Sequence, residues 1–564
     1  MSKITFVTAF LNIYETPFEK RDVEWRFTHF RKLAQLGIQL AVFCSPDCFA
    51  YMEEMIVEFP NVKIVKYVTL NEMWTYKTCE SVQELLLPDV RNIEKDTREY
   101  IILQNSKTEF LKDAVEINPW NSTHFAWIDF NIFHVFKDTE SYASEYIQHL
   151  SGQTFIDKCL VIPGCWGKKR VNHDNLSNHI CWRWCGGFLL GDSESILNFH
   201  RLYESYFRDF LEKTKRLVWE VNFWAFLEME SFLNATWYLG DHNLSILKIP
   251  FDIYCKKLTV DKSRRYHFPE KENYLPSSIS WICHKNTNFL NIRYVNYWIY
   301  PKGGYLINHP ERHIYTKNVC CTFDEETLET TDYNDMKDES VSLVNHGGNI
   351  HGIEDIRLYE LRGELFFVGS NMNYSSGGRI RIIQGKYNVY EKTFDDCKIV
   401  ESPNMISWCE KNWIPLIKEG CEYFIYKWWP LQIGVINEKK DDKTNCHQLD
   451  IVIQHDIITP IFENVRGSSP FIETDEGFIG VVHFSEETEP RHYYHMLVLL
   501  DKTTLKPLKY SNHFYFNNIS IEFCIGFSIK CDDYYFWISN FDRDPELVIT
   551  NQMNIPLQND IVCE

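Results

Sequence analysis

Asp129 has the setting most suggestive of chemistry in the first half of the chain. It directly follows the short apolar run Phe125–Ile128, which is typical of a buried strand. Ligands of open α/β sheets bind where strands end at their carboxyl edge. A carboxylate there could hold a divalent metal against a diphosphate, because hard cations prefer oxygen ligands and share them with phosphates. On spacing alone, a capping or turn aspartate is an equally good interpretation.

The second half of the chain contains another group of charged and amide side chains that could do chemistry. Charged residues on strands otherwise rich in aromatics are costly to bury unless they meet one another or a ligand. A ring of structural salt bridges is the alternative. We favour a ligand site, because the group offers one strong acid among several cations and amides. Its members are Arg293, Asp355, Lys411, Asn412 and Arg466.

The first half alternates patterns typical of strands and helices. A βαβαβ order of this kind predicts a parallel sheet with covering helices. We expect this α/β domain to span residues 1–262, with a charged, aromatic linker near 250–274. The expected strands are Ile4–Phe10, Gln39–Phe43, Val62–Tyr67 and Phe125–Ile128, and the expected helices are Trp25–Leu36, Phe49–Glu58, Thr108–Ile117, Ser193–Lys213 and Trp219–Leu233.

The second half contains a repeat of short alternating strands. By subtraction of positions, the first two starts lie 63 residues apart and the others 56. A hairpin cannot bury its face alone, but five such units arranged radially can, which predicts an all-β five-bladed propeller over residues 275–564. A large β-sandwich, or a pair, is the alternative. The strand starts are Asn291, Glu354, Glu410, Arg466 and Glu522.

Composition narrows the functional class. The formal net charge of -20 argues against nucleic-acid binding, which uses basic faces, but does not exclude a nucleotide. The 18 cysteines show no CxxC spacing and are expected to be free thiols in a reducing compartment. The start of the chain lacks a signal-peptide pattern, and no apolar run is long enough to cross a bilayer. These features predict a cytoplasmic location.

Four segments of the first half resemble the HtrL/YibB-type glycosyltransferase family. The similarity spans roughly residues 1–250 and implies a GT-A-like, Rossmann-like fold. It also implies that Asp129 stands at the metal and nucleotide-sugar position. In the usual D-x-D signature the third residue is acidic, whereas here it is Asn131, a weaker neutral ligand. The segments are VTAF (7–10), Asn105-Ser106-Lys107, NPWNSTHFAWIDF (118–130) and CWRWCGGFLLG (181–191).

The same resemblance suggests residues that would surround the nucleotide sugar. Thr8 and Ala9, at the end of the first strand, would border the nucleotide. Lys107 would offset diphosphate charge, or is a solvated helix lysine. Gly186 and Gly187 permit close backbone approach to a ligand, or only make a tight turn.

Two further residues have expected roles in the first domain. Glu220 lies in a Trp-rich stretch, where a carboxylate could deprotonate an acceptor hydroxyl. A buried glutamate paired with arginine is an equally good interpretation. His242 would be a second metal ligand beside Asp129, or is structural. The expected cofactor of this domain is Mn²⁺ or Mg²⁺, which would stabilise the departing diphosphate.

The second half resembles the five-bladed propellers of glycoside hydrolase family 130 and glycosyltransferase family 108. Those families act on β-mannosides as phosphorylases, hydrolases or mannosyltransferases. The similarity covers most of residues 280–545 and follows the blades in order. The matching pieces are GIEDIR (352–357), EKNWIPLI (410–417), RGSSPFIETDEGFIGVVHF (466–484) and HMLVLLD (495–501).

This resemblance places the catalytic acid/base on Asp355. The family motif E-D-P-R corresponds to Glu354-Asp355-Ile356-Arg357. The acid would act through a sugar hydroxyl that relays the proton, so one carboxylate suffices where most glycosidases use two. No cofactor is expected here. The side chains expected to contact phosphate, nucleotide diphosphate or sugar hydroxyls are Arg293, Glu354, Lys411, Asn412, Arg466 and His483.

Two departures from the family pattern shape the functional hypothesis. Ile356 replaces the motif proline, and Pro430-Leu431 stands where phosphorylases carry Pro-His, which removes a phosphate ligand. We therefore expect a bifunctional glycosyltransferase whose propeller is a β-mannosyltransferase. The alternatives are a β-mannoside phosphorylase or hydrolase, and a non-catalytic glycan-binding propeller. The expected partners are a nucleotide sugar such as GDP-mannose and an oligosaccharide or glycoconjugate acceptor; a homo-oligomer is left open.

Overall fold

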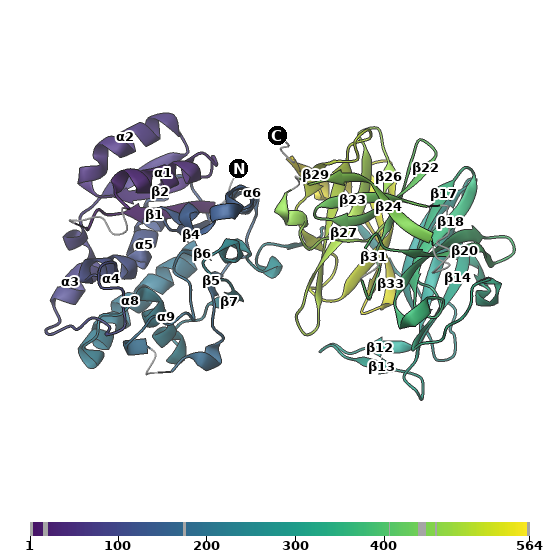
Figure 1. Ribbon diagram of the computed structural model, residues 1–564, viewed down its shortest axis with the longest axis horizontal. Helices are drawn as coiled ribbons and strands as arrows, with labels where there is room; N and C mark the ends of the chain where they lie inside the picture. The colour runs from purple at the N-terminus through teal and green to yellow at the C-terminus, as the bar shows by residue number, and fades with distance from the viewer. Residues whose placement is uncertain are drawn as a thin grey trace. The chain divides into compact units, whose positions relative to one another are not determined.

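The computed structural model describes residues 4–14, 21–172, 176–404, 407–437, 447–456 and 459–560. The chain divides into two compact units, Met1–Tyr254 and Cys255–Glu564, called here the N-terminal and C-terminal units (Figure 1). The sequence-based boundaries, 1–262 and 275–564, differ because the intervening strands β8 (Lys256–Lys257) and β9 (Lys262–Arg265) pair with strands of the C-terminal unit. Among the described residues, no helix is long and apolar enough to cross a membrane.

A seven-stranded mixed sheet forms the centre of the N-terminal unit. Its order is β3-β2-β1-β4-β6-β5-β7. Strand β1 pairs in parallel with β2 and β4, and β2 with β3, as predicted for these four strands; β6, which was not predicted, runs antiparallel to β4 and β5. The strands are β1 (Ile4–Phe10), β2 (Leu40–Cys44), β3 (Val62–Tyr67), β4 (His124–Ile128), β5 (Leu160–Gly164), β6 (Phe188–Asp192) and β7 (Thr236–Leu239).

Helices flank this sheet (Figure 1). Helix α8 shows why they form where they do. The Asp192 side chain accepts hydrogen bonds from the Glu194 and Ser195 N–H groups and caps the helix, whose buried residues follow a helical period. The helices are α1 (Val23–Ala34), α2 (Phe49–Glu58), α3 (Trp74–Glu80), α4 (Arg98–Asn105), α5 (Lys107–Ile117), α6 (Glu140–Gly152), α8 (Ser193–Thr214) and α9 (Glu220–Met229).

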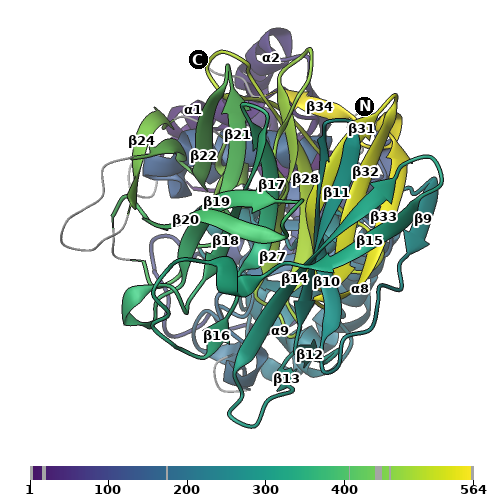
Figure 2. The ribbon, with the colours of Figure 1, turned by 90° about the vertical axis from the view of Figure 1, so that its right-hand side faces the viewer.

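The C-terminal unit is built from five successive antiparallel blades, of which the second and third share one eight-stranded sheet (Figure 2). Each blade has four principal strands, and blades two and three are joined by the pairing of β20 with β24. The first blade contains β10 (Leu275–His284), β11 (Thr287–Val295), β14 (Ile314–Asp324) and β15 (Glu329–Asp335), and the second contains β17 (Glu354–Leu361), β18 (Glu364–Asn371), β19 (Arg381–Asn388) and β20 (Thr393–Glu401). The third contains β21 (Ile414–Lys418), β22 (Cys421–Trp428), β23 (Leu431–Ile436) and β24 (His447–His455), and the fourth contains β25 (Arg466–Gly467), β27 (Phe478–Glu486), β28 (His492–Leu500) and β29 (Pro507–Ser511). The fifth contains β31 (Glu522–Lys530), β32 (Asp533–Asn540), β33 (Arg543–Asn551) and β9.

These sheets close into a propeller-like ring. Strand β10 of the first blade contacts β17 of the second and β31 of the fifth, and β17 contacts β21 of the third. The fourth blade contacts the third through β25 and the fifth through β27. Strand β9, from the start of the unit, completes the fifth blade beside β33 (Figure 2). Because β9 precedes the first blade in the chain, its pairing with β33 closes the ring and covers the edge of the last blade.

Short strands and a small hairpin accompany the blades. In the fourth blade, β26 (Ile472–Glu473) pairs with β27, β30 (Phe514–Tyr515) with β28, and β34 (Leu557–Asp560) with β29. In the first blade, β16 (Ile350–His351) pairs with β14. Strands β12 (Tyr297–Ile299) and β13 (Tyr305–Ile307) form a separate hairpin between β11 and β14.

The predicted start of the first repeat lies one strand too late. Asn291 lies on β11, the second strand of the first blade, and the blade begins with β10. The sequence Lys302-Gly303-Gly304, which has the pattern of a turn inside the repeat, belongs to the β12–β13 hairpin rather than to a blade. An inserted hairpin has the same strand–turn–strand pattern as a blade start, which explains both the error and the longer first spacing.

Glu522, at the start of the fifth blade, is expected to make the stability of the C-terminal unit depend on pH. Burial raises its pKa to about 7 from an ordinary 4.5, although the N–H groups of Phe516, Asn517 and Asn518 donate to it at 2.8 Å. Because the folded pKa exceeds the unfolded one, its stabilising contribution is complete below pH 4.5 and is lost as pH rises through about 7.

The expected loss is about 3 kcal/mol between pH ~4.5 and pH ~8, since each pKa unit corresponds to about 1.4 kcal/mol. Glu522→Gln should flatten this dependence, whereas Glu476→Gln, at an exposed position, should follow the native chain. Denaturant unfolding at several pH values, read by hydrogen exchange of peptides from the C-terminal unit, checks this. Parallel pH profiles for Glu522→Gln and the native chain would contradict it.

Candidate functional site

A cavity opens in the N-terminal unit where β1 and β4 end. Ala9 and Phe10 come from β1, while Asp129 and Asn131 follow β4 directly. This is the carboxyl edge of the parallel part of the sheet, where the sequence placed the ligand. Of the predicted residues of this unit, those that line the cavity are Ala9, Lys107, Asp129, Asn131, Gly186, Gly187, Glu220 and His242.

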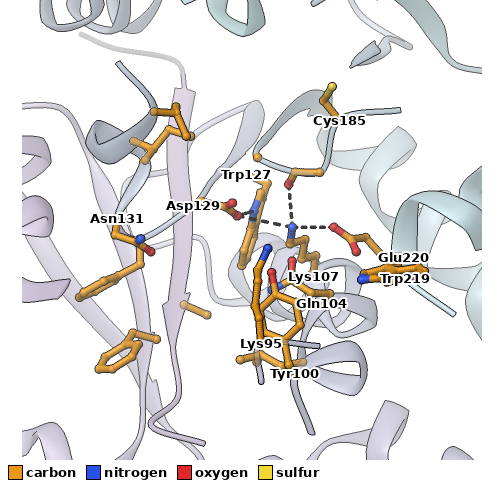
Figure 3. A pocket seen from close by; sticks show the side chains of 18 of the residues that line it. Lys95, Tyr100, Gln104, Lys107, Trp127, Asp129, Asn131, Cys185, Trp219 and Glu220 are labelled. Carbon is orange, nitrogen blue, oxygen red and sulfur yellow. Dashed lines mark hydrogen bonds and ion pairs between the residues drawn. The ribbon is translucent and has the colours of Figure 1, made fainter. Parts of the chain in front are cut away.

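Lys107 is the centre of a charge network in this cavity (Figure 3). Its Nζ donates to Glu220 Oε1 at 2.8 Å and to the Gly186 carbonyl at 2.7 Å, and lies 3.4 Å from Asp129 Oδ1. The side chains of Lys107 and Glu220 are 3% and 6% exposed, whereas that of Asp129 is 36% exposed. Asp129 is therefore the member of the network that a ligand reaches most easily.

Local structure brings these groups together. Lys107 is the first residue of α5 and Glu220 the first of α9, so both helix starts face the end of β4. Gly186 is needed for this approach, because a Cβ there would lie 2.0 Å from Glu220 Oε1 and 2.9 Å from Lys107 Nζ. Trp127 fixes Asp129 by donating its indole N–H to Oδ1 at 2.8 Å.

The network changes the interpretation of Lys107. Burial alone would lower its pKa, but Asp129 and Glu220 outweigh burial and raise it, so the ammonium stays charged. Its charge is already balanced by two carboxylates. Lys107 is therefore not a spare cation for a diphosphate, and it holds Asp129 and Glu220 in place instead.

The donor set around Asp129 fits a divalent cation poorly. Its Oδ1 accepts from Trp127 and lies beside the Lys107 ammonium, which would repel a metal. His242 lines the same cavity but is hydrogen-bonded to Asp241. Within the described ranges, no group of three His, Cys, Asp or Glu side chains is placed to hold a metal ion. Binding of Mn²⁺ or Mg²⁺ by the N-terminal unit therefore remains a prediction.

Thr8 lies apart from the other predicted residues of this unit. It is fully buried in β1 and does not belong to the cavity lining. Its hydroxyl has no hydrogen-bond partner among the described residues. The cavity lies at the end of β1, where Ala9 and Phe10 line it, and Thr8 comes before them in the strand.

In the C-terminal unit, Asp355 sits in a bulge of the first strand of the second blade. The register of β17 against β18 shifts between Glu354 and Arg357, and Asp355 has a left-handed φ of 50°. Bulges re-aim side chains and are common beside active sites, and aspartate tolerates this conformation better than most residues. The Asp355 side chain is 14% exposed, so it is not sealed in the core.

Arg293 and Lys411 surround this pair of acids. Arg293 donates to Asp355 Oδ1 and to Glu354 Oε1, both at 2.7 Å, and Lys411 donates to Glu354 Oε2 at 2.9 Å. Burial would raise the pKa of Glu354, but Lys411 and Arg293 outweigh it and lower that pKa well below its usual range. The structure thus brings together four of the predicted residues, from three blades.

Arg357 is a site residue that the sequence analysis missed. It is fully buried and donates to the Asp355 carbonyl at 3.0 Å and to Asn412 Oδ1 at 3.2 Å. It also donates to the Ser468 carbonyl at 2.6 Å, which links the second and fourth blades. Arg357 therefore anchors the bulge that presents Asp355. Its place in the quoted E-D-I-R motif was the available signal.

Asp542 is a second missed residue, from the turn between β32 and β33. Its Oδ2 accepts from the Tyr297 hydroxyl at 2.7 Å. Burial raises the pKa of Asp542, and the nearby charges of Asp355 and Glu354 add to the increase. The charge of this third carboxyl group is thus coupled to those of Asp355 and Glu354. Nothing in the sequence separated it from an ordinary hairpin aspartate.

Arg466 and His483 are neighbours on adjacent strands of the fourth blade. They are directly opposite in the pairing of β25 with β27. His483 is buried and hydrogen-bonded to Ser468 Oγ at 2.9 Å, and burial lowers its pKa well below the usual value. Arg466 is exposed. Neither has a hydrogen bond to Asp355 among the described residues, so their expected role as ligand contacts stays a prediction.

Comparison with known sequences gives a match in the first part of the chain. The model of the family described as "Bacterial protein of unknown function (HtrL_YibB)" matches residues 2–215, which confirms the N-terminal resemblance. Protein HtrL of Escherichia coli (strain K12) is 26% identical over 149 residues, which cover 24% of this chain and 52% of that protein. The chain thus spans about half the length of this curated relative.

Solved structures similar to the chain include mannoside-active proteins. A β-1,2-mannobiose phosphorylase from Listeria innocua has 13% identity and a TM-score of 0.33, and covers 51% of this chain and 97% of its own. A member of the GH130 family of mannoside phosphorylases has 9% identity and a TM-score of 0.35, with coverages of 54% and 99%. A GDP-Man-dependent mannosyltransferase from Leishmania mexicana has 10% identity and a TM-score of 0.35, with coverages of 54% and 95%. Likeness this weak supports no statement about activity.

Proposed function

We propose that the N-terminal unit is a glycosyltransferase of GT-A-like fold that uses a nucleotide-sugar donor. The observation that carries the proposal is the Lys107 network, which holds two carboxylates in an open cavity at the end of β4. The resemblance of the WIDF segment supports it. The parallel order β3-β2-β1-β4 places that segment at the carboxyl edge of the sheet, where nucleotides bind in open α/β folds.

The two carboxylates have different settings, which suits different roles. Glu220 is nearly buried at the start of α9, and among the described residues its ion-pair partner is Lys107, through Oε1. Its other oxygen can accept a proton from an acceptor hydroxyl that enters the cavity, as a general base requires. Asp129 is more exposed and is held by Trp127, which suits a group that positions the donor.

For the C-terminal unit, the proposal is β-mannosyl transfer with Asp355 as acid/base. The motif resemblance names the residue, and the geometry supports it. Asp355 is bulged out of its strand, is partly exposed, and lies within hydrogen-bond distance of Arg293. Arg293 and Lys411 hold the two acids in place through charge-assisted hydrogen bonds, which are the strong ones.

The N-terminal assignment is tested on the full chain with a panel of nucleotide sugars, with and without Mn²⁺. Donor hydrolysis and sugar transfer are both measured. Asp129→Ala should lower one donor-dependent activity by roughly 10- to 100-fold, because a group that positions charge near the reacting bond is lost. Asp355→Asn should leave that same activity unchanged. Equal donor hydrolysis and transfer by native chain and Asp129→Ala would reject the proposal.

A further inference from the structure

The cavity of the N-terminal unit has an excess of positive charge. Its lining includes the cationic side chains of Arg26, Lys95 and Lys107, but among the described residues only two carboxylates, those of Asp129 and Glu220. Lys107 already lies against both carboxylates. The excess is notable in a chain whose formal net charge is -20. A concave site with surplus positive charge attracts anions.

Arg26 is held in a setting that disfavours its charge. It lies on the first turn of α1, and its guanidinium carbon is 5.4 Å from the centroid of the Phe10 ring. Burial lowers the pKa of Arg26, and the nearby charge of Arg21 lowers it further. Within the described ranges, Arg26 forms no ion pair with a carboxylate. A partly buried cation of this kind is stabilised when an anion binds beside it.

Lys95 is the second cation with this character. Its Nζ lies 5.2 Å from the centroid of the Tyr100 ring, and its backbone carbonyl accepts from the Tyr14 hydroxyl at 2.7 Å. Figure 3 shows Lys95 and Tyr100 reaching into the cavity that also holds the Lys107 network. In the described part of the chain, Lys95 too has no carboxylate partner. Aromatic rings on two separate segments thus present two cations to one cavity.

We propose that Arg26 and Lys95 bind the diphosphate of a nucleotide and do so without a divalent metal. The inference rests on the proposed function of the N-terminal unit and names the part of the ligand that this wall recognises. A doubly negative diphosphate would balance the charges of Arg26 and Lys95, neither of which has a carboxylate partner among the described residues. Asp129 Oδ1 already accepts from Trp127 and lies beside Lys107, so it is poorly placed to bind a metal. This agrees with a diphosphate site in which side chains, and not a metal, balance the negative charge.

Calorimetric titration of the full chain with inorganic pyrophosphate and with GDP, in the presence of EDTA, tests the proposal. The native chain should bind both probes, and binding should weaken as salt is raised. Arg26→Gln and Lys95→Gln should each weaken binding by about 10-fold or more, as expected for the loss of a charge-assisted hydrogen bond. Arg26→Lys should recover part of the loss. Arg208→Gln, on the exposed face of α8, should bind as the native chain does.

Two results would overturn the inference. One is binding of pyrophosphate and GDP only when Mn²⁺ or Mg²⁺ replaces EDTA. The other is native affinity in both Gln variants. If Arg26→Gln fails to fold, Lys95→Gln decides alone, because Lys95 lies outside the regular elements. Metal-free binding that depends on these cations, with no sugar transfer from any donor, would keep the diphosphate site and reject the proposed transferase.

Discussion

Replacing Asp355 by asparagine is expected to lower the turnover of the C-terminal mannosyl reaction by roughly 10²- to 10⁴-fold, the range that positioned acid/base groups supply. Asparagine keeps the size of the side chain and a hydrogen bond to Arg293, but it cannot exchange a proton at that position. The assays are GDP-mannose-dependent transfer to β-mannosides and phosphate-dependent release of mannose 1-phosphate. Whichever reaction the native chain performs is the one that should be lost.

Asp396→Asn is a matched control for this experiment. Asp396 also has a left-handed φ, of 49°, and an ion pair, with Lys386 at 3.4 Å, but its side chain is 75% exposed. The control therefore reproduces the backbone setting and the loss of a charge outside the proposed site. It should retain native turnover. If Asp355→Asn also leaves every activity of the chain unchanged, the propeller serves only to bind glycan.

The elements that sequence could locate are those whose signal is local. The limits predicted for β1, α2 and β3 coincide with the structure, because each is a short segment with a clear apolar pattern between turn residues. Asp129 was placed correctly at the end of β4 for the same reason. Strand direction is not a local property, so the reversal of β6 within the sheet could not be seen.

The charges of the two sites illustrate what sequence could not give. Lys107 was identified as a ligand-facing cation, but its pairing with Glu220 joins residues 113 positions apart. The contact of Tyr297 with Asp542 joins residues 245 positions apart. Residue type shows that a group can be charged, whereas only the fold shows which opposite charge it meets. The unbalanced pair Arg26 and Lys95 became visible in the same way.

The first blade is the one assigned incorrectly from the sequence, because its inserted β12–β13 hairpin has the same strand–turn–strand pattern as the repeat. Arg293 was assigned to a first strand, but it lies on the second strand of its blade and still reaches Glu354 and Asp355. A long arginine side chain can extend across the face of a sheet, so strand number alone did not decide which side chains meet. From Glu354 onward the predicted starts match the blades, which among the described residues carry no hairpin between their second and third strands.

Replacing Lys107 by methionine is expected to lower the free energy of unfolding of the N-terminal unit by about 3–5 kcal/mol, the cost of breaking a buried ion pair by removing one partner. Methionine fills similar space, but Glu220, with 6% exposure, then stays buried without an opposite charge. Asp129 is more exposed and can be solvated. Denaturant unfolding, read by hydrogen exchange of peptides from the N-terminal unit, measures the change.

Two further variants separate the loss of the ion pair from other effects of Lys107→Met. Lys112→Met removes another lysine of α5, whose pairs with Asp113 and Glu116 are partly exposed, and should cost less than about 1 kcal/mol. Lys107→Met combined with Glu220→Gln should recover most of the stability lost by Lys107→Met, because the unpaired buried charge is removed as well. If the double variant is no more stable than the single one, the loss comes from the Gly186 contact or from packing. The charge network would then not be what holds Asp129 and Glu220 at the cavity.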